Sequence, residues 1–225
     1  MELYVDSANI DEIRHAASLG ILSGVTTNPS LIAKEDPNVD VKQRILEIYE
    51  LVGGHLSVEV ISTDTAGMLK EADEILEWFP NATIKIPMIA DGLAAVKKLS
   101  SQNIPTNVTL IFSPAQALAA HAAGATYVSV FVGRVDDISL NGMDIIRDVR
   151  DIWDVQGLDS KILAASIRHP MHIVESAKAG AHIATIPYKV LMQSLKHPLT
   201  DSGLASFLSD YKKNQEARQK LMGRI

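Results

Sequence analysis

Lys85 is the residue whose surroundings point most directly to covalent chemistry. It lies between Ile84 and Ile86 in a short apolar run that is typical of a β-strand. Successive strand side chains point to opposite faces, so Lys85 should face away from both isoleucines and into a protein interior. A desolvated lysine carries more of the neutral amine, the form that attacks a carbonyl carbon. An exposed place at a strand end is the alternative interpretation of the same run.

Polar residues on one strand face recur in three neighbouring runs. The side chains that alternate with apolar ones there are Glu59, Asn107, Thr109 and Ser129, with Phe131 on the same face. The steps from 59 to 85, 85 to 109 and 109 to 131 are 26, 24 and 22 residues, each close to one strand-plus-helix repeat. Side chains on adjacent strands, about 4.8 Å apart, would bring a carboxylate, an amine and hydroxyls together. This recurrence favours an active site over a lone exposed lysine.

Two earlier strand ends add polar groups. Asp6 ends the first apolar run, and Asn28 follows the second, directly before Pro29. Each has a plain structural alternative. Asn followed by Pro is a good helix N-cap and first-turn pair, and Asp6 could satisfy turn amides only.

Basic residues that suit a phosphate group come late in the chain. Arg134 follows the sixth apolar run, and Ser166 and Arg168 follow the seventh. Arginine forks match phosphate oxygens, so these three residues are candidates for a phosphate clamp. The alternatives are an ion pair of Arg134 with Asp136 or Asp137, and plain surface exposure of Arg168.

The sequence offers no clear metal or cofactor motif. His169 and His172 are spaced three apart, but no acidic residue in a matching motif completes a ligand set, and solvated histidines are the more common explanation. No Gly-x-Gly-x-x-Gly loop follows the first strand, and cysteine is absent. We therefore expect neither a metal nor a cofactor.

Short apolar runs alternate with amphipathic stretches along the whole chain. The expected strands are Leu3–Asp6, Ile21–Thr26, Leu56–Ile61, Thr83–Ile86, Asn107–Ile111, Tyr127–Val132, Lys161–Ala165 and Ala181–Ile186. The clearest helical stretches are Thr65–Trp78, Gly92–Leu99, Pro114–Ala122, Asp144–Trp153 and Met171–Ala179. Eight alternating units predict a parallel α/β fold, a (β/α)8 TIM barrel in a single domain over 1–225, with a doubly wound open sheet as the alternative.

A last segment, Thr200–Ile225, follows the eighth unit. Leu204, Phe207, Leu208 and Tyr211 have the spacing of one helical face. We expect an additional C-terminal amphipathic helix. Its apolar stripe could pack on its own barrel or dock on a neighbouring subunit.

Composition excludes several classes of protein. The 225 residues are 47% hydrophobic with a formal net charge of -6, which argues against a nucleic-acid surface. We find no apolar run long enough to span a membrane and no signal-peptide pattern, so we expect a cytoplasmic protein without a membrane partner.

Five stretches together resemble those of the transaldolase family, whose small branch also contains fructose-6-phosphate aldolases. They are Val25–Ser30, Ile84–Pro87, Asn107–Ala117, Val130–Asp137 and Leu163–Arg168. The resemblance runs from Asp6 to the C-terminal helix. It implies a metal-independent barrel that acts on sugar phosphates and assembles as pentamers or decamers, with the C-terminal helix exchanged between neighbours.

The resemblance also implies a role for each candidate residue. Lys85 would form a Schiff base, Glu59 and Thr109 would hold a catalytic water, and Asp6 would act as general acid and base. The residues implied to bind substrate are Asn28, Asn107 and Ser129 for the dihydroxyacetone part and Arg134, Ser166 and Arg168 for phosphate.

Two positions distinguish the branches. The aldolases carry Gln and Tyr where this chain has Glu59 and Phe131, so the resemblance favours a transaldolase of the pentose phosphate pathway. The implied reaction converts sedoheptulose 7-phosphate and glyceraldehyde 3-phosphate to erythrose 4-phosphate and fructose 6-phosphate. An aldolase that releases free dihydroxyacetone is the alternative, and a non-catalytic sugar-phosphate-binding barrel is a third hypothesis.

Overall fold

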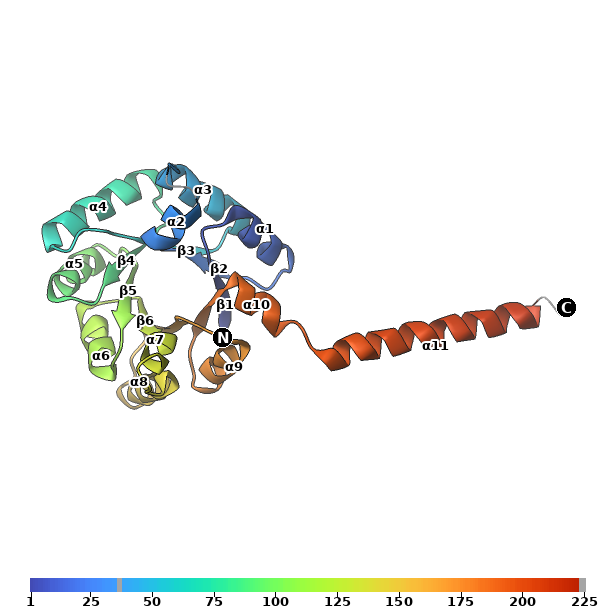
Figure 1. The fold of residues 1–225 in the computed structure, drawn as a ribbon. Coiled ribbons are helices and arrows are strands. Elements are labelled where there is room, and N and C mark those ends of the chain that lie inside the picture. Colours follow the sequence, from blue (N-terminus) through green and yellow to red (C-terminus); the bar gives the residue numbers. More distant parts are fainter. Residues whose placement is uncertain (36–37, 223–225) are drawn as a thin grey trace. The chain divides into compact units, whose positions relative to one another are not determined.

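The computed structural model describes residues 1–35 and 38–222, and the chain divides into two compact units between Leu191 and Met192. In the first unit the described strands form a closed parallel barrel in sequence order, completed by the pairing of β1 with β8. Figure 1 shows helices around this ring of strands. The strands are β1 (Glu2–Asp6), β2 (Gly24–Thr26), β3 (His55–Glu59), β4 (Thr83–Pro87), β5 (Thr106–Ile111), β6 (Tyr127–Phe131), β7 (Lys161–Ala165) and β8 (Ile183–Pro187). The predicted (β/α)8 barrel is confirmed, and the open sheet is excluded.

Helices follow the strands along the chain. They are α1 (Ile10–Ser18), α2 (Pro29–Glu35), α3 (Val41–Val52), α4 (Thr65–Trp78), α5 (Ala90–Ser101), α6 (Pro114–Ala123), α7 (Val132–Asp136), α8 (Gly142–Gln156), α9 (Pro170–Lys178), α10 (Tyr188–Ser194) and α11 (Pro198–Met222). The predicted bounds of α4 and β7 agree with the structure, and the other strands and helices named above differ by a few residues. The short helices α2, α7 and α10 were not predicted from periodicity.

Local sequence explains where the longer helices begin and end. The Asp64 carboxylate accepts a hydrogen bond from Gly67 N at the start of α4, and Ser113 Oγ accepts one from Gln116 N at the start of α6, where Pro114 follows. Both are N-cap arrangements that satisfy free backbone amides of the first turn. At the end of α6, Gly124 has a φ of 99°, a left-handed conformation that favours glycine. These signals fix the turns that lead into the next strand.

Side-chain alternation separates two layers of packing. The β-branched residues on one strand face, such as Ile86, meet the helices, since a Cβ added to Gly92 of α5 would lie 3.1 Å from Ile86 Cγ2. A second cluster fills the barrel interior; it contains Tyr4, Leu163, Ala165 and Ile183, with Tyr127 and Phe131 packed against it. The predicted alternation therefore places Lys85, whose neighbours Ile84 and Ile86 are fully buried, in the barrel interior.

The second unit contains the long helix α11, which spans Pro198–Met222. Leu204, Phe207, Leu208 and Tyr211 are all exposed on it. The predicted helix began at Thr200, and its last residues, 223–225, lie outside the described part of the chain. Among the described residues, none of the helices combines the length and the apolar character needed to cross a bilayer.

Candidate active site

Lys85 and Glu59 form an ion pair inside the barrel. The two residues are paired in register on β4 and β3, and Lys85 Nζ lies 2.8 Å from Glu59 Oε2. Nζ also donates a hydrogen bond to the carbonyl oxygen of Thr27, at 3.3 Å. Only 8% of the lysine side chain and 18% of the glutamate side chain are exposed. Lys85 is therefore buried and paired, and the exposed strand end considered above does not apply.

Asn107 and Ser129 continue the polar face on β5 and β6. Ser129 Oγ donates to Asn107 Oδ1 at 2.7 Å, and Asn107 Nδ2 donates to Ser57 Oγ at 3.1 Å. All three residues are buried. Asn107 is also the register partner of Lys85, so this chain of hydrogen bonds lies beside the buried amine. The structure thus brings together the residues that the strand pattern grouped, and it adds Ser57.

Thr109 lies at an irregularity of β5. The register between β5 and β6 shifts between Val108 and Ile111, and Leu110 has a φ of 63°. Such a bulge bends the strand and redirects its side chains, and strain of this kind is common at functional sites. The buried Oγ1 of Thr109 makes no hydrogen bond to any residue that the structure describes. Because buried hydroxyls normally have partners, this oxygen is suited to hold a small polar ligand.

Asp6 lies at the carboxyl end of β1 and is held by a threonine pair. Thr26 Oγ1 donates to Asp6 Oδ1 at 2.9 Å and lies 2.5 Å from Thr185 Oγ1. Desolvation raises the pKa of the Asp6 carboxyl; the Lys85 ammonium and the Thr26 hydroxyl oppose this rise, whereas Glu59 adds to it. A carboxyl whose pKa is raised above its ordinary value is better suited to general acid and base work. Among the described residues, the donor to the Asp6 carboxylate is a threonine side chain rather than a turn amide.

Asn28 caps the start of α2, which is the structural alternative that the Asn28–Pro29 pair suggested. Its Oδ1 accepts a hydrogen bond from Leu31 N, at 3.0 Å, in the first turn of α2. This contact fixes the orientation of the amide group, because the oxygen is engaged with the backbone. The residue before it, Thr27, accepts from Lys85 Nζ through its carbonyl oxygen, so Asn28 lies next in sequence to a contact of the buried amine.

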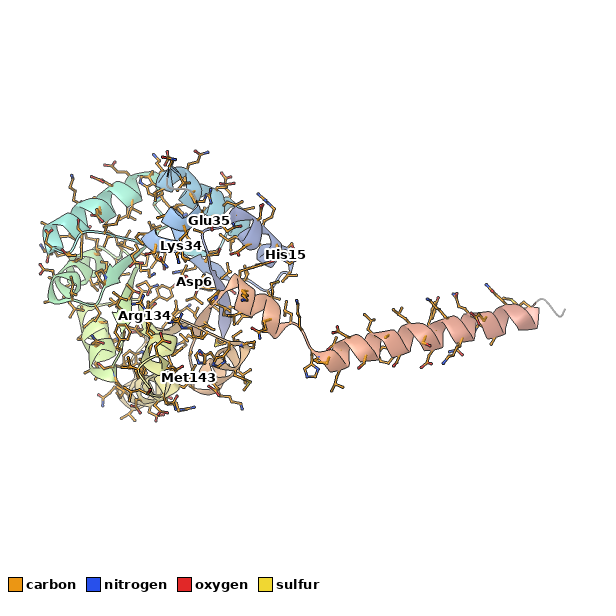
Figure 2. All side chains as sticks on the ribbon, in the orientation of Figure 1. Asp6, His15, Lys34, Glu35, Arg134 and Met143 are labelled. Carbon is orange, nitrogen blue, oxygen red and sulfur yellow. The ribbon has the colours of Figure 1, made fainter. Side chains whose placement is uncertain are left out.

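The two candidate phosphate-binding arginines come from adjacent strand ends. A Cβ added to Gly133 would lie 2.1 Å from the carbonyl oxygen of Ser166 and 2.7 Å from Arg168 Cγ, so glycine permits this close approach. Arg134 lies with Cζ 5.1 Å from the centre of the Phe131 ring, a cation–π geometry. Figure 2 labels Arg134 and Asp6, which both lie toward the middle of the ring of helices in this view.

The loop that carries Arg168 is braced by a histidine and two aspartates. Arg168 pairs with Asp137, at 2.8 Å, and its backbone amide donates to His172 Nδ1 at 3.3 Å. His172 Nε2 lies 2.9 Å from Asp136 Oδ2. Burial lowers the pKa of His172, and His169 lowers it further. The aspartates considered as alternative partners of Arg134 instead contact Arg168 and His172, and His172 is buried rather than solvated.

No group of three or more potential metal ligands occurs among the described residues. An apolar cavity of about 230 Å³ does adjoin the site, on the side of α2 and α3. Its walls include Ile32, Ile45 and Val58, with Asn28 and Glu59 at one edge. Most of its walls are apolar and offer few partners to the hydroxyls of a sugar, whereas buried polar side chains gather in the barrel interior.

Comparison with known proteins gives a consistent result. Residues 3–223 match the family model described as transaldolase/fructose-6-phosphate aldolase. A probable transaldolase of Geobacillus thermodenitrificans (strain NG80-2) is 55% identical over 215 residues, which are 96% of this chain and 100% of that protein. A probable transaldolase of Desulforudis audaxviator (strain MP104C) is 57% identical over 211 residues, 94% of this chain and 97% of that protein.

Proposed function

Because this chain belongs to the transaldolase/fructose-6-phosphate aldolase family, we propose that it transfers a dihydroxyacetone unit between sugar phosphates through a Schiff base on Lys85. The observation that carries this proposal is the buried ion pair of Lys85 with Glu59, at 2.8 Å, on adjacent barrel strands. In the reaction sequence, sedoheptulose 7-phosphate and glyceraldehyde 3-phosphate give erythrose 4-phosphate and fructose 6-phosphate, a step of the pentose phosphate pathway in the cytoplasm.

The covalent step begins at the ketose carbonyl. The neutral amine of Lys85 attacks carbon 2, and loss of water from the carbinolamine gives an iminium ion. Glu59 passes protons through a water that it shares with Thr109, whose buried hydroxyl has no partner among the described residues. The negative charge of Glu59 lies within hydrogen-bond distance of Nζ and stabilises the positive iminium nitrogen.

Carbon–carbon cleavage then requires a base at the neighbouring hydroxyl. Asp6 takes the proton of the hydroxyl on carbon 4, the C3–C4 bond breaks, and its electron pair moves into the iminium to form an enamine. The aldose phosphate leaves as an aldehyde. When an acceptor aldehyde arrives, the enamine attacks it, and Asp6 returns the proton to the new alkoxide.

Polar side chains hold the parts of the substrate that do not react. Asn107 and Ser129, which are linked by a 2.7 Å hydrogen bond, face the dihydroxyacetone carbons together with Asn28. Arg134, Ser166 and Arg168 bind the phosphate. The Arg168–Asp137 ion pair is half exposed, and pairs of this kind are worth only about 0–1 kcal/mol, so a phosphate can displace the aspartate.

Replacing Arg134 or Arg168 with alanine should weaken recognition of phosphate. We expect KM for a phosphorylated ketose to rise by about 10- to 100-fold, the equivalent of one charge-assisted hydrogen bond. Unphosphorylated analogues should lose much less. Arg147→Ala is the matched control, since Arg147 also pairs with an aspartate and is equally exposed. Equal losses on both substrate types would contradict the phosphate role.

Phe131 supports transfer over release. Its ring packs against Phe112 at 5.7 Å between centroids and lies under Arg134, and it has no proton to give to the enamine. Turnover of fructose 6-phosphate should therefore depend on an acceptor aldehyde, with little free dihydroxyacetone. Wild type that releases dihydroxyacetone as fast as it transfers it would instead be an aldolase.

Phe131→Tyr should raise the release of dihydroxyacetone. The added hydroxyl supplies a proton donor at the end of β6, and a tenfold shift in partitioning needs only about 1.4 kcal/mol of barrier. Adding Glu59→Gln should also lower transfer, because it removes the negative charge beside Lys85. The measurement is dihydroxyacetone formed per transfer event, with and without glyceraldehyde 3-phosphate. Phe112→Tyr is a control that adds a hydroxyl to the partner ring.

The C-terminal helix supports assembly into pentamers or decamers. Leu204, Phe207 and Leu208 are more than half exposed on α11, and a helix with an apolar stripe gains most of its stability by burying that stripe. A chain ending at Leu199 should give smaller or aggregated species by light scattering. A control with Lys212→Ala and Lys213→Ala keeps the stripe and should assemble normally. An unchanged oligomer after truncation would show that the helix is not an assembly element.

A further inference from the structure

Alternate side chains of β3 point into the barrel interior. His55, Ser57 and Glu59 alternate with Leu56 and Val58, so the three share the inner face of the strand. Glu59 pairs with Lys85 at the carboxyl end of the strand, and Ser57 contacts Asn107 in the middle. His55 lies at the amino end of the strand, away from the reacting groups. The proposed mechanism assigns no role to His55 or Ser57.

His55 is held firmly in place. Its ring stacks on Tyr4, with 5.1 Å between centroids and an interplanar angle of 24°, and meets Tyr127 edge-on at 4.6 Å. A Cβ added to Gly24 on the neighbouring strand would lie 3.0 Å from both His55 Cβ and Tyr4 Cε1. Glycine at position 24 therefore makes room for these two rings. A ring fixed on several sides presents its nitrogen in one direction only.

Hydrogen bonds connect His55 to the substrate-binding pair. His55 Nε2 lies 2.8 Å from Ser57 Oγ, Ser57 Oγ accepts from Asn107 Nδ2 at 3.1 Å, and Asn107 Oδ1 accepts from Ser129 Oγ at 2.7 Å. Ser57, Asn107 and Ser129 are each at most 2% exposed. Bulk water therefore has little access to these groups, and the direction of each bond depends on its neighbours in the chain.

The proton of Ser57 determines the direction of the whole chain. Ser57 has one hydroxyl proton, and the amide of Asn107 already donates to its oxygen. Among the described residues, His55 Nε2 is the other polar atom in hydrogen-bond contact with Ser57 Oγ, so the serine proton goes to that nitrogen. Burial lowers the pKa of His55 to about 4, with Glu2 raising and Lys161 lowering it, so the ring is neutral and has one bare nitrogen that can accept this proton.

Without an acceptor at position 55, two arrangements would compete. In one, Asn107 presents its carbonyl to Ser129, as the structure has it. In the other, the amide is flipped, Ser57 donates to the carbonyl, and Asn107 donates to Ser129. The flipped state reverses what Ser129 and Asn107 offer to a ligand. A hydrogen-bond acceptor fixed at position 55 leaves only the first arrangement.

We propose that His55 is a positioning residue that, through Ser57, fixes the hydrogen-bond direction of Asn107 and Ser129. In this direction Asn107 keeps one N–H for an oxygen of the substrate, and Ser129 keeps lone pairs for a substrate hydroxyl. The pair is thereby complementary to a hydroxyketone, which offers both groups. This inference rests on the proposed function for its substrate, but the direction of the chain itself is a property of the free protein.

The direction can be measured without any substrate. In protein labelled with ¹⁵N-histidine, NMR near pH 7 should give His55 as the tautomer with a proton on Nδ1 and a bare, hydrogen-bonded Nε2. The His55→Phe spectrum assigns the signal, and Ser57→Ala should shift Nε2 toward a nitrogen without a donor. Lys85→Met should keep the wild-type tautomer. A proton on Nε2 in wild type would overturn the proposal.

Kinetics test the consequence for the reaction. His55→Phe keeps both ring contacts and loses the acceptor, so kcat/KM for transfer should fall about tenfold, the effect of about one hydrogen bond, while borohydride still traps the ketose on Lys85. His55→Gln, whose amide oxygen can accept, should recover part of the loss. His121→Phe is the matched control, because His121 also contacts a serine hydroxyl, at 2.7 Å, and an aromatic ring, Trp153.

A double variant distinguishes positioning from simple destabilisation. If His55 acts through Ser57, His55→Phe in a Ser57→Ala background should cost no further activity. Fully additive losses, equal losses in His55→Phe and His121→Phe, or loss of trapping in His55→Phe would each overturn the proposal. If wild type neither forms an adduct nor transfers, the proposed function fails, and the NMR experiment still decides the direction of the chain.

Discussion

Lys85→Met should abolish transfer and leave no trapped adduct. Methionine fills most of the space of the lysine, but it has no amine to attack the carbonyl, so neither the iminium nor the enamine forms. We expect a loss of at least about 10³-fold in kcat, which corresponds to about 4 kcal/mol of barrier. The measurement is transfer activity, together with the mass of the protein after incubation with fructose 6-phosphate and borohydride. Wild type should gain the mass of the reduced sugar at Lys85.

The chain offers a matched control for this experiment. Lys161 is also a strand lysine paired with a glutamate, Glu2, at 3.5 Å, but it lies at the start of β7 and about 44% of its side chain is exposed. Lys161→Met should keep both the adduct and the activity. An adduct that forms equally in Lys85→Met would show that another amine carries the chemistry. Chelators should leave wild-type activity unchanged, because in the proposed mechanism the lysine supplies the electron sink.

Lys85→Met should also lower the stability of the fold, because it removes the partner of Glu59. It leaves Glu59 with only 18% of its side chain exposed and no cation beside it, and an uncompensated charge of this kind is unfavourable. The double variant Lys85→Met with Glu59→Gln should therefore unfold at a higher temperature than the single variant while remaining inactive. Such a result would separate the structural cost of the ion pair from its use in catalysis.

The barrel could be predicted because its signals are local and repeated. Lys161–Ala165 and Thr65–Trp78 agreed with the structure, since each is a continuous apolar or amphipathic run with clear limits. The second strand was overestimated: Ile21–Thr26 was expected and Gly24–Thr26 is observed. Ile21 is exposed, and the pairing of β2 begins only at Gly24, opposite His55. Where a strand begins to pair depends on contacts with its neighbouring strands, which an apolar run alone does not predict.

Strand alternation predicted the polar residues that line the barrel interior, but not the residues that hold them in place. Strand alternation grouped Glu59, Lys85, Asn107 and Ser129; in the structure the first two form an ion pair and the last two a hydrogen bond, on successive strands. His55 and Ser57 follow the same alternation, but His55 precedes the expected strand Leu56–Ile61, and Ser57 lies below the Val58–Val60 run that carries the signal. The irregularity at Leu110 and the ion pair of Arg168 with Asp137 depend on tertiary contacts, for which the sequence carries no periodic signal.

Asp6→Asn should have opposite effects on activity and stability. The carboxyl is desolvated, and its pKa is raised above the ordinary value in spite of Lys85 and Thr26, so ionised Asp6 is unfavourable in the folded state. Its contribution to stability is fully present below the unfolded pKa and is lost as pH rises through the folded value. Asparagine is neutral and still accepts from Thr26. The variant should therefore be more stable than wild type at neutral pH, as measured by thermal unfolding.

Activity of the same variant should fall by about 10²- to 10⁴-fold, the usual contribution of a general acid and base. The acidic limb of the wild-type kcat/KM profile should report the Asp6 carboxyl and lie above the ordinary range of an aspartate. Thr26→Val removes a hydrogen bond that holds this pKa down, so the limb should move to still higher pH, whereas Thr26→Ser keeps the hydroxyl and should leave it in place. A limb that moves to lower pH in Thr26→Val, or full activity in Asp6→Asn, would assign proton transfer to another residue.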